Sequence, residues 1–300
     1  MPSLYFTDMR ILPFISPLMP PGISGHCIRN KTQNGGCSAC ATACQTGAIS
    51  LAARQPVLDV EKCLGCGDCL FACPADAIDS LSPIERKYQD NTLSGKGNRF
   101  VPSVNELLMW HALRGIRRVS LDRGNTAWQA AVVALNCVLA RIGEPIWQIV
   151  HPDGEQVDHS RRRWLGRPFN QDQSSGRMPA GQRAVRAAFP AISWFQVSVD
   201  TEGCTLCGAC SRLCPEQAVT LTGTHLQIDA ARCTGCLACE GVCFPRAIHI
   251  KPWAASAHPR LLPVTACQCR DCRTAFVSFS ADETRCPLCR RHTHGMRALT

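Results

Sequence analysis

The sequence predicts a multidomain α+β protein, with two copies of a small cysteine-bearing module, a small α/β domain between them and a further cysteine-rich unit near the C-terminus. Three observations support this prediction. The 300 residues include 22 cysteines, far more than an ordinary globular chain carries. Most of these cysteines recur in two segments with the same spacing, and alternating helix and strand patterns lie between the segments. With only 10 Phe, 6 Trp and 2 Tyr the apolar core is thin, so bound metal is expected to help hold the fold.

An internal repeat relates two segments of the chain. Seven cysteines of the first segment each match a cysteine lying 170 residues later. The matched pairs are Cys37 and Cys207, Cys40 and Cys210, Cys44 and Cys214, Cys63 and Cys233, Cys66 and Cys236, Cys69 and Cys239, and Cys73 and Cys243. This agreement indicates two copies of one module, expected at residues 27–80 and 196–252.

The cysteine spacing within each copy is typical of iron–sulfur ligands. The pattern C-x2-C-x2-C-x3-C begins at Cys63, Cys204 and Cys233, and a proline follows its last cysteine in the first two cases. Three thiolates on one tight loop reach three corners of a cubane, whereas the fourth points away and binds the neighbouring cluster. Disulfides or unrelated zinc sites are the alternative, which this repeated spacing disfavours.

This rule assigns four ligand sets to four [4Fe-4S] clusters. They are Cys27, Cys37, Cys40 and Cys73; Cys44, Cys63, Cys66 and Cys69; Cys204, Cys207, Cys210 and Cys243; and Cys214, Cys233, Cys236 and Cys239.

One ligand position departs from the repeat, because Asn34 stands where the second copy has Cys204. Cys27 is the nearest upstream cysteine, and an inserted loop containing Gly35 and Gly36 would return it to the site. We therefore expect Cys27 to be the missing ligand. The alternative is a free Cys27 thiol and a cluster that lacks one iron.

Both segments resemble bacterial-type two-cluster ferredoxins over roughly 105 residues, and the quoted cysteine runs carry the resemblance. The resemblance implies a pseudo-symmetric fold of two short hairpins and two helices around two [4Fe-4S] clusters. Strands are expected at residues 49–51, 57–60, 219–221 and 225–228.

The C-terminal unit has two C-x2-C pairs, formed by Cys269 and Cys272 and by Cys286 and Cys289, with a strand pattern at residues 275–279. Two such pairs predict a four-thiolate zinc ribbon. A rubredoxin-like mononuclear iron site is the alternative, although such sites usually have glycine after the second cysteine of each pair. Cys267 is interpreted as a spare thiol.

The middle of the chain predicts a helix–strand–helix–strand unit. Helices are expected at residues 104–111 and 126–141, and strands at 117–121 and 146–150. Ser103 is the expected N-cap of the first helix, with Glu106 three residues later. In the second helix, Ala131, Leu135, Val138 and Leu139 form the expected buried side, and Cys137 is expected to be a core thiol.

Composition sets the other domain boundaries. The expected segments are a Pro-rich tail at residues 1–26, a linker at 81–100, the α/β domain at 101–150, a basic flexible linker at 151–195 and the zinc ribbon at 262–294.

Several functional classes are excluded at this level. No run of 18 uncharged apolar residues predicts a transmembrane segment, and five prolines in the first 22 residues do not fit a signal peptide, so a cytoplasmic protein is expected. The chain has a net charge of +9, but the segments richest in cysteine are slightly acidic. The formal charges of residues 1–80 sum to −1, and those of residues 201–244 sum to −2. Thiolate-bound clusters would bring the loaded chain close to neutrality, so its basicity does not indicate a nucleic-acid partner.

The expected function is electron transfer as a polyferredoxin, or as the iron–sulfur subunit of an oxidoreductase complex with a redox partner protein. No Walker loop, nucleophile elbow or dinucleotide fingerprint is present, so no independent enzymatic activity is expected. The alternative is a redox-sensing or assembly protein that uses the ribbon and the basic C-terminal residues to bind nucleic acid or a client.

Overall fold

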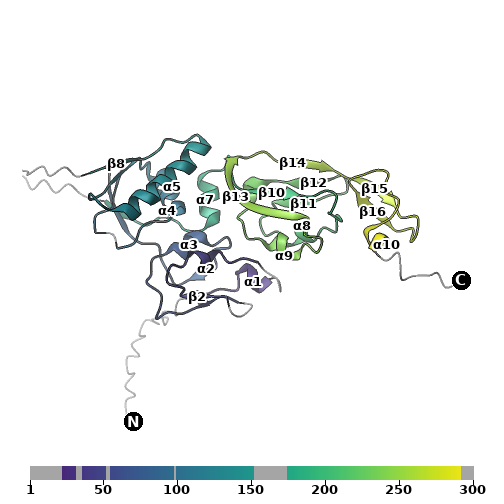
Figure 1. The fold of residues 1–300 in the computed structure, drawn as a ribbon, viewed down its shortest axis with the longest axis horizontal. Coiled ribbons are helices and arrows are strands. Elements are labelled where there is room, and N and C mark those ends of the chain that lie inside the picture. Colours follow the sequence, from purple (N-terminus) through teal and green to yellow (C-terminus); the bar gives the residue numbers. More distant parts are fainter. Residues whose placement is uncertain (1–21, 32–35, 52–54, 98, 152–173, 292–300) are drawn as a thin grey trace, which may run out of the picture.

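The computed structural model describes residues 22–31, 36–51, 55–97, 99–151 and 174–291. The protein is elongated, with the central domain at one end and the C-terminal four-cysteine unit at the other (Figure 1). The second cysteine module lies between them, and the first module lies to one side, below the central domain in this view (Figure 1). None of the helices in the described ranges is long and apolar enough to cross a bilayer.

The first module is built from very short elements. They are β1 (Gly22–Ile23), α1 (Ile28–Lys31), α2 (Ala39–Ala43), β2 (Ile49–Ser50), β3 (Val57–Leu58), α3 (Asp68–Ala72) and β4 (Ile78–Asp79). Strand β1 pairs antiparallel with β4, and β2 pairs antiparallel with β3. The two strands predicted in this module are confirmed, although each has only two residues.

The second module repeats this arrangement with longer outer strands. Its elements are β10 (Ile192–Val199), α8 (Ala209–Leu213), β11 (Val219–Leu221), β12 (His225–Ile228), η2 (Ala230–Arg232), α9 (Ala238–Val242), β13 (Ile248–Ser256) and β14 (Arg260–Pro263). Strand β10 pairs antiparallel with β13, as β1 pairs with β4. The predicted strands at 219–221 and 225–228 are confirmed at those residues. Strand β14 joins the β11–β12 hairpin and continues into the C-terminal unit.

The central domain is a five-stranded mixed sheet with strand order β8-β7-β6-β5-β9. Its elements are β5 (Arg86–Gln89), β6 (Thr92–Ser94), α4 (Val104–Arg114), β7 (Arg118–Ser120), α5 (Thr126–Ile142), β8 (Gln148–Val150), β9 (Ser174–Gly176) and α7 (Gln182–Ala188). Strands β6, β7 and β8 are parallel and are connected through α4 and α5, whereas β5 runs antiparallel to both its neighbours.

Local sequence sets the ends of the two long helices. The Ser103 hydroxyl accepts a hydrogen bond from the Glu106 N–H (3.3 Å), which confirms the predicted N-cap of α4. Asn125 caps α5 in the same way through the Trp128 N–H (3.3 Å). Both helices end at a glycine in the left-handed region, Gly115 (φ 62°) and Gly143 (φ 77°), where other residues would be strained.

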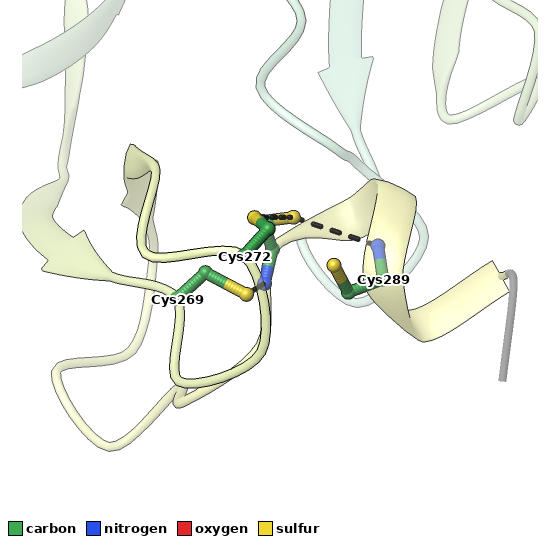
Figure 2. A group of neighbouring side chains, drawn as sticks. Cys269, Cys272 and Cys289 are labelled. Atoms are coloured by element: carbon green, nitrogen blue, oxygen red, sulfur yellow. Dashed lines mark hydrogen bonds between the residues drawn. The ribbon is translucent and has the colours of Figure 1, made fainter. Parts of the chain in front are cut away.

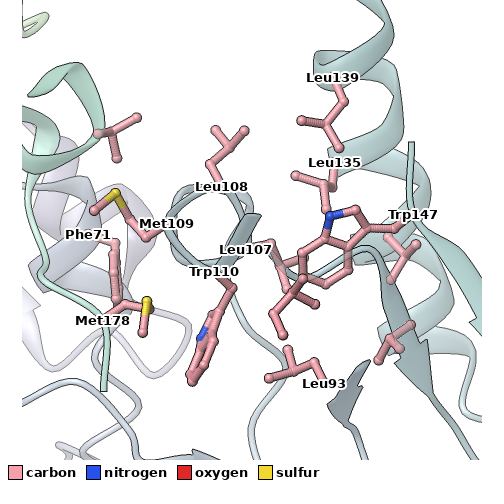
Figure 3. Close-up of a cluster of buried hydrophobic side chains, with 14 of the residues drawn as sticks. Phe71, Leu93, Leu107, Leu108, Met109, Trp110, Leu135, Leu139, Trp147 and Met178 are labelled. Atoms are coloured by element: carbon pink, nitrogen blue, oxygen red, sulfur yellow. The ribbon is translucent and has the colours of Figure 1, made fainter. Parts of the chain in front are cut away.

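The largest apolar core lies in the central domain and extends into the first module through Phe71 (Figure 3). Helix α4 contributes Leu107, Leu108, Met109 and Trp110, and α5 contributes Leu135 and Leu139. Arg86 of β5 and Glu106 of α4 form a buried ion pair in the same domain, in which Arg86 Nη2 lies 2.9 Å from Glu106 Oε2. The carbonyl of Phe100 and the indole of Trp110 also bond to this pair, so its polar atoms are satisfied.

The structure corrects the two predicted linkers. Residues 81–100 hold strands β5 and β6, and Leu93 of β6 is completely buried. Within 151–195, residues 152–173 lie outside the described residues, but β9, α7 and the start of β10 are ordered elements. Strands β5, β6 and β9 have only three or four residues, too few to show a clear period-two pattern, which explains why the sequence did not predict them.

Two predictions about α5 also change. Its fully buried residues are Trp128, Val132, Leu135 and Leu139, whereas Ala131 and Val138 are only partly buried against the same core. Cys137 is exposed, so its interpretation as a core thiol was wrong. The buried side of the helix therefore includes Trp128 and Val132 besides the predicted Leu135 and Leu139.

Candidate metal centres

The short helices of both modules place cysteines at the ends of tight loops. Before three of these helices the chain adopts a left-handed conformation, at Gly67 (φ 80°), Gly208 (φ 70°) and Leu237 (φ 58°). This conformation reverses the loop direction, so the preceding cysteines and the helical cysteine face a common point. Glycine is favoured there for steric reasons, and Leu237 is the strained exception.

The last cysteine of each run receives a recurring hydrogen bond. The N–H of the residue four positions later donates to the sulfur at 3.2 Å in three cases: Ala77 to Cys73, Ala218 to Cys214 and Ala247 to Cys243. These donors stabilise negative charge on a thiolate and fix the direction of its sulfur. The local fold therefore prepares these cysteines to act as anionic ligands.

In the first module, Cys27, Cys37, Cys40 and Cys73 line one small cavity. The repeat explains how Cys27 arrives there. The Ser24 N–H bonds to the Ala77 carbonyl (2.9 Å), and the Asp200 N–H bonds to the Ala247 carbonyl in the same way (2.7 Å). Cys27 lies three residues after Ser24, and Cys204 lies four residues after Asp200. The two cysteines therefore occupy similar positions relative to this shared backbone contact in the two modules.

The other cysteines of the first module form a second group around Cys69. Burial raises the pKa of Cys69 to about 12, and the charges of Cys66, Cys40, Cys63 and Cys44 add to this shift. Cys69 is buried, and Cys44, Cys63 and Cys66 are partly buried.

The second module contains two equivalent groups. Cys204, Cys207, Cys210 and Cys243 line one cavity. Cys214, Cys233, Cys236 and Cys239 line another. Three cavities of the described residues are thus each lined by three cysteines of one stretch of the chain and the last cysteine of another.

Comparison with protein families agrees with this geometry. Residues 35–77 match a family described as a 4Fe-4S dicluster domain, and residues 196–244 match a second family with the same description. The chain contains two 4Fe-4S dicluster domains. A comparison of the chain with curated proteins gives no match.

Several buried cysteines of the dicluster domains lie in surroundings that disfavour a free thiolate. Burial raises the pKa of Cys40 and Cys210 to about 11 and that of Cys233 to about 12, with neighbouring cysteine charges adding to the effect. A thiolate ligand in these sites therefore requires the compensating charge of bound iron. Four cysteines around one small cavity provide the donor set of a [4Fe-4S] cluster.

The C-terminal unit follows the second dicluster domain and contains β15 (Thr265–Gln268), β16 (Ala275–Ser278) and α10 (Pro287–Arg291). Cys269, Cys272, Cys286 and Cys289 place their sulfurs within 4.8 Å of one another, which fits a zinc-ribbon-like motif (Figure 2). The Cys272 and Cys286 sulfurs are 3.8 Å apart. A tetrahedral zinc site with Zn–S bonds of about 2.3 Å requires nearly the same sulfur separation.

The electrostatics of this unit differ from those of the dicluster domains. Backbone hydrogen bonds from Cys272 and Cys286 lower the pKa of Cys269 to about 6, which favours its thiolate form, whereas the neighbouring sulfurs of Cys286 and Cys272 raise the pKa of Cys289 to about 12. Arg273, after the second cysteine, has a left-handed backbone (φ 59°), a conformation for which glycine is more usual.

The remaining candidates from the sequence lie apart from these groups. Cys267 is not a member of the four-sulfur group, and its sulfur lies near the Thr265 and Ser280 carbonyls. Of the basic C-terminal residues, 292–300 lie outside the described residues. Sequence analysis does not point to Arg183 and Arg186, because they fall in the segment interpreted as a linker.

Proposed function

We propose that the protein transfers electrons through four [4Fe-4S] clusters, as a polyferredoxin or as the iron–sulfur subunit of an oxidoreductase complex. The observation that carries the proposal is that twelve of the sixteen proposed ligands line three small cavities, with four cysteines around each cavity. The proposed ligands are Cys27, Cys37, Cys40 and Cys73; Cys44, Cys63, Cys66 and Cys69; Cys204, Cys207, Cys210 and Cys243; and Cys214, Cys233, Cys236 and Cys239.

A bound [4Fe-4S] cluster supplies one-electron transfer without a bond-making step. Four cysteine ligands leave no iron position open to a substrate. The chain itself adjusts the potential, through the N–H donors to Cys73, Cys214 and Cys243 and through burial of the sulfurs. These features support a carrier function and a redox partner protein.

Anaerobically purified protein is expected to accept electrons from a strong reductant and to pass them reversibly to an artificial acceptor, without loss of iron. The same preparation should convert no small-molecule metabolite when supplied with the reductant alone. Iron content and visible absorbance are measured before and after repeated cycles. Loss of clusters on each oxidation would favour the redox-sensing alternative instead, and sustained turnover of a metabolite would contradict the carrier function.

We also propose that the C-terminal four-cysteine group holds zinc. The sulfur separation and the lowered pKa of Cys269 support this proposal. Such a small unit has few apolar contacts, so the free energy of metal binding contributes directly to its folding.

Metal analysis of the purified protein is expected to give about one zinc beside about sixteen iron atoms per chain. Cys286→Ser should lose the zinc and make residues 264–291 sensitive to protease, while iron content stays the same. Cys267→Ser is the matched control, because it lies in the same unit outside the four-sulfur group. An isolated ferric four-thiolate spectrum without zinc would assign the site to mononuclear iron.

A further inference from the structure

Helix α7 connects the central domain to the second dicluster domain and also contacts the first (Figure 1). The Gln182 backbone N–H donates to the Cys73 carbonyl (3.1 Å). Arg183 Nη1 donates to Asp76 Oδ2 and to the Ala75 carbonyl, both at 3.1 Å. The N-terminal half of α7 is therefore held against the loop that carries the last cysteine of the first domain.

The same helix binds the second dicluster domain. Arg183 Nε donates to Glu216 Oε1 (2.7 Å), and Arg186 Nη1 donates to Glu216 Oε2 (2.8 Å) and to the Arg232 carbonyl (2.6 Å). Glu216 lies two residues after Cys214, and its side chain is 11% exposed. Because both its oxygens accept from arginines, this carboxylate is held in one orientation.

The two dicluster domains also contact each other directly, through loops that carry cysteines. Cys27 and Cys73 of the first domain pack in one apolar cluster with Cys236 of the second, together with small alanine side chains. The Cys37 sulfur lies close enough to Cys236 for its charge to act on that thiol. A cavity of about 610 Å³ is lined by Cys37 on one side and by Thr234 and Gly235 on the other.

The acidic residues at this contact are not a common feature of the repeat. With the 170-residue offset, Asp76 corresponds to Arg246 and Glu216 corresponds to Thr46. Each of these two acids thus occurs only in the domain where it contacts α7 and has no acidic counterpart in the other domain. This asymmetry supports a role in joining the domains over a role in the fold of each module.

We propose that Arg183 and Arg186 of α7 are positioning residues, which hold the Cys27/Cys37/Cys40/Cys73 group next to the Cys214/Cys233/Cys236/Cys239 group and create a direct electron path between the two dicluster domains. This inference rests on the proposed function. It implies that electrons cross from one domain to the other inside the chain, without an external carrier.

Electron paramagnetic resonance of the fully reduced, iron-loaded protein tests the proposal, because two reduced clusters held close together split each other's signals. In wild-type protein, a cluster of the first domain and a cluster of the second should split each other's signals, in addition to any splitting between the two clusters within one domain. Glu216→Thr should lose the splitting between the domains while keeping wild-type iron content, since threonine already occupies the equivalent position of the first domain. Arg183→Gln should have the same effect and serves as the second variant if Glu216→Thr alters iron loading.

Two matched controls remove the same charges elsewhere. Glu202→Thr changes an exposed acid of the second dicluster domain, and Arg177→Gln changes an arginine in an exposed ion pair with Glu85. Both controls should keep the splitting. Splitting that persists in Glu216→Thr and Arg183→Gln would overturn the positioning role.

Wild-type protein with a full iron complement and no splitting between the domains would overturn the direct path, while leaving electron transfer by separate clusters intact. Wild-type protein that binds no iron would contradict the proposed function itself. The two failures are therefore distinguishable.

Discussion

Cys27→Ser is expected to convert one of the four clusters to a three-iron form or to abolish it. Cys27 lines the same cavity as Cys37, Cys40 and Cys73, and no other described cysteine lines that cavity. Iron content should fall from about sixteen atoms per chain to between about twelve and fifteen, depending on which outcome occurs. Electron paramagnetic resonance of the oxidised protein distinguishes them, since a three-iron cluster gives a signal that an oxidised four-iron cluster does not.

Cys137→Ser is the control for this variant. Cys137 is exposed on α5, outside all the cysteine groups, so its replacement should leave iron content and spectra unchanged. Unchanged iron and spectra in Cys27→Ser would show that Cys27 is not a ligand.

Glu106→Ala is expected to destabilise the central domain by about 3–5 kcal/mol, because it leaves the Arg86 guanidinium buried without its counter-charge. The Arg86 side chain is completely buried and Glu106 is 2% exposed, so solvent cannot compensate for the loss. Unfolding in guanidinium chloride, monitored by hydrogen exchange of the α4 amides, measures the change in the free energy of unfolding.

The exposed pair of Lys96 and Asp122 provides the comparison, with its charged atoms 3.6 Å apart. Asp122→Ala should cost about 1 kcal/mol or less, because solvent already screens this pair. A similar small cost for Glu106→Ala would mean that the buried pair contributes no more than a surface pair.

The sequence was most informative where spacing alone determines structure. The repeated cysteine runs predicted both dicluster domains, and the strands at 219–221 and 225–228 followed from alternation between turn residues. The N-cap at Ser103 was predictable because capping depends on residues three positions apart.

The sheet of the central domain was less predictable. Strands β5 and β9 pair with each other although 85 or more residues separate them, and each has four residues or fewer. Arg86, a charged residue, occupies a core position only because Glu106 of α4 neutralises it there. Such positions depend on tertiary partners that local pattern does not reveal.

The contacts of α7 also required the structure. Arg183 and Arg186 are ordinary surface residues by composition, and their partners Asp76 and Glu216 lie 107 and 33 residues away from Arg183. Only the repeat offset gives a hint, since it shows that each acid lacks an equivalent in the other domain.

The position of Arg183 along the chain has a consequence for biosynthesis. It is 107 residues downstream of Asp76, its partner in the first dicluster domain. At about 5–20 residues per second, a ribosome needs on the order of 5–20 s to translate this interval. The first dicluster domain therefore leaves the ribosome well before α7 exists, with the face around Cys27 and Cys73 still uncovered. That face is covered only after α7 and the second domain have been synthesised.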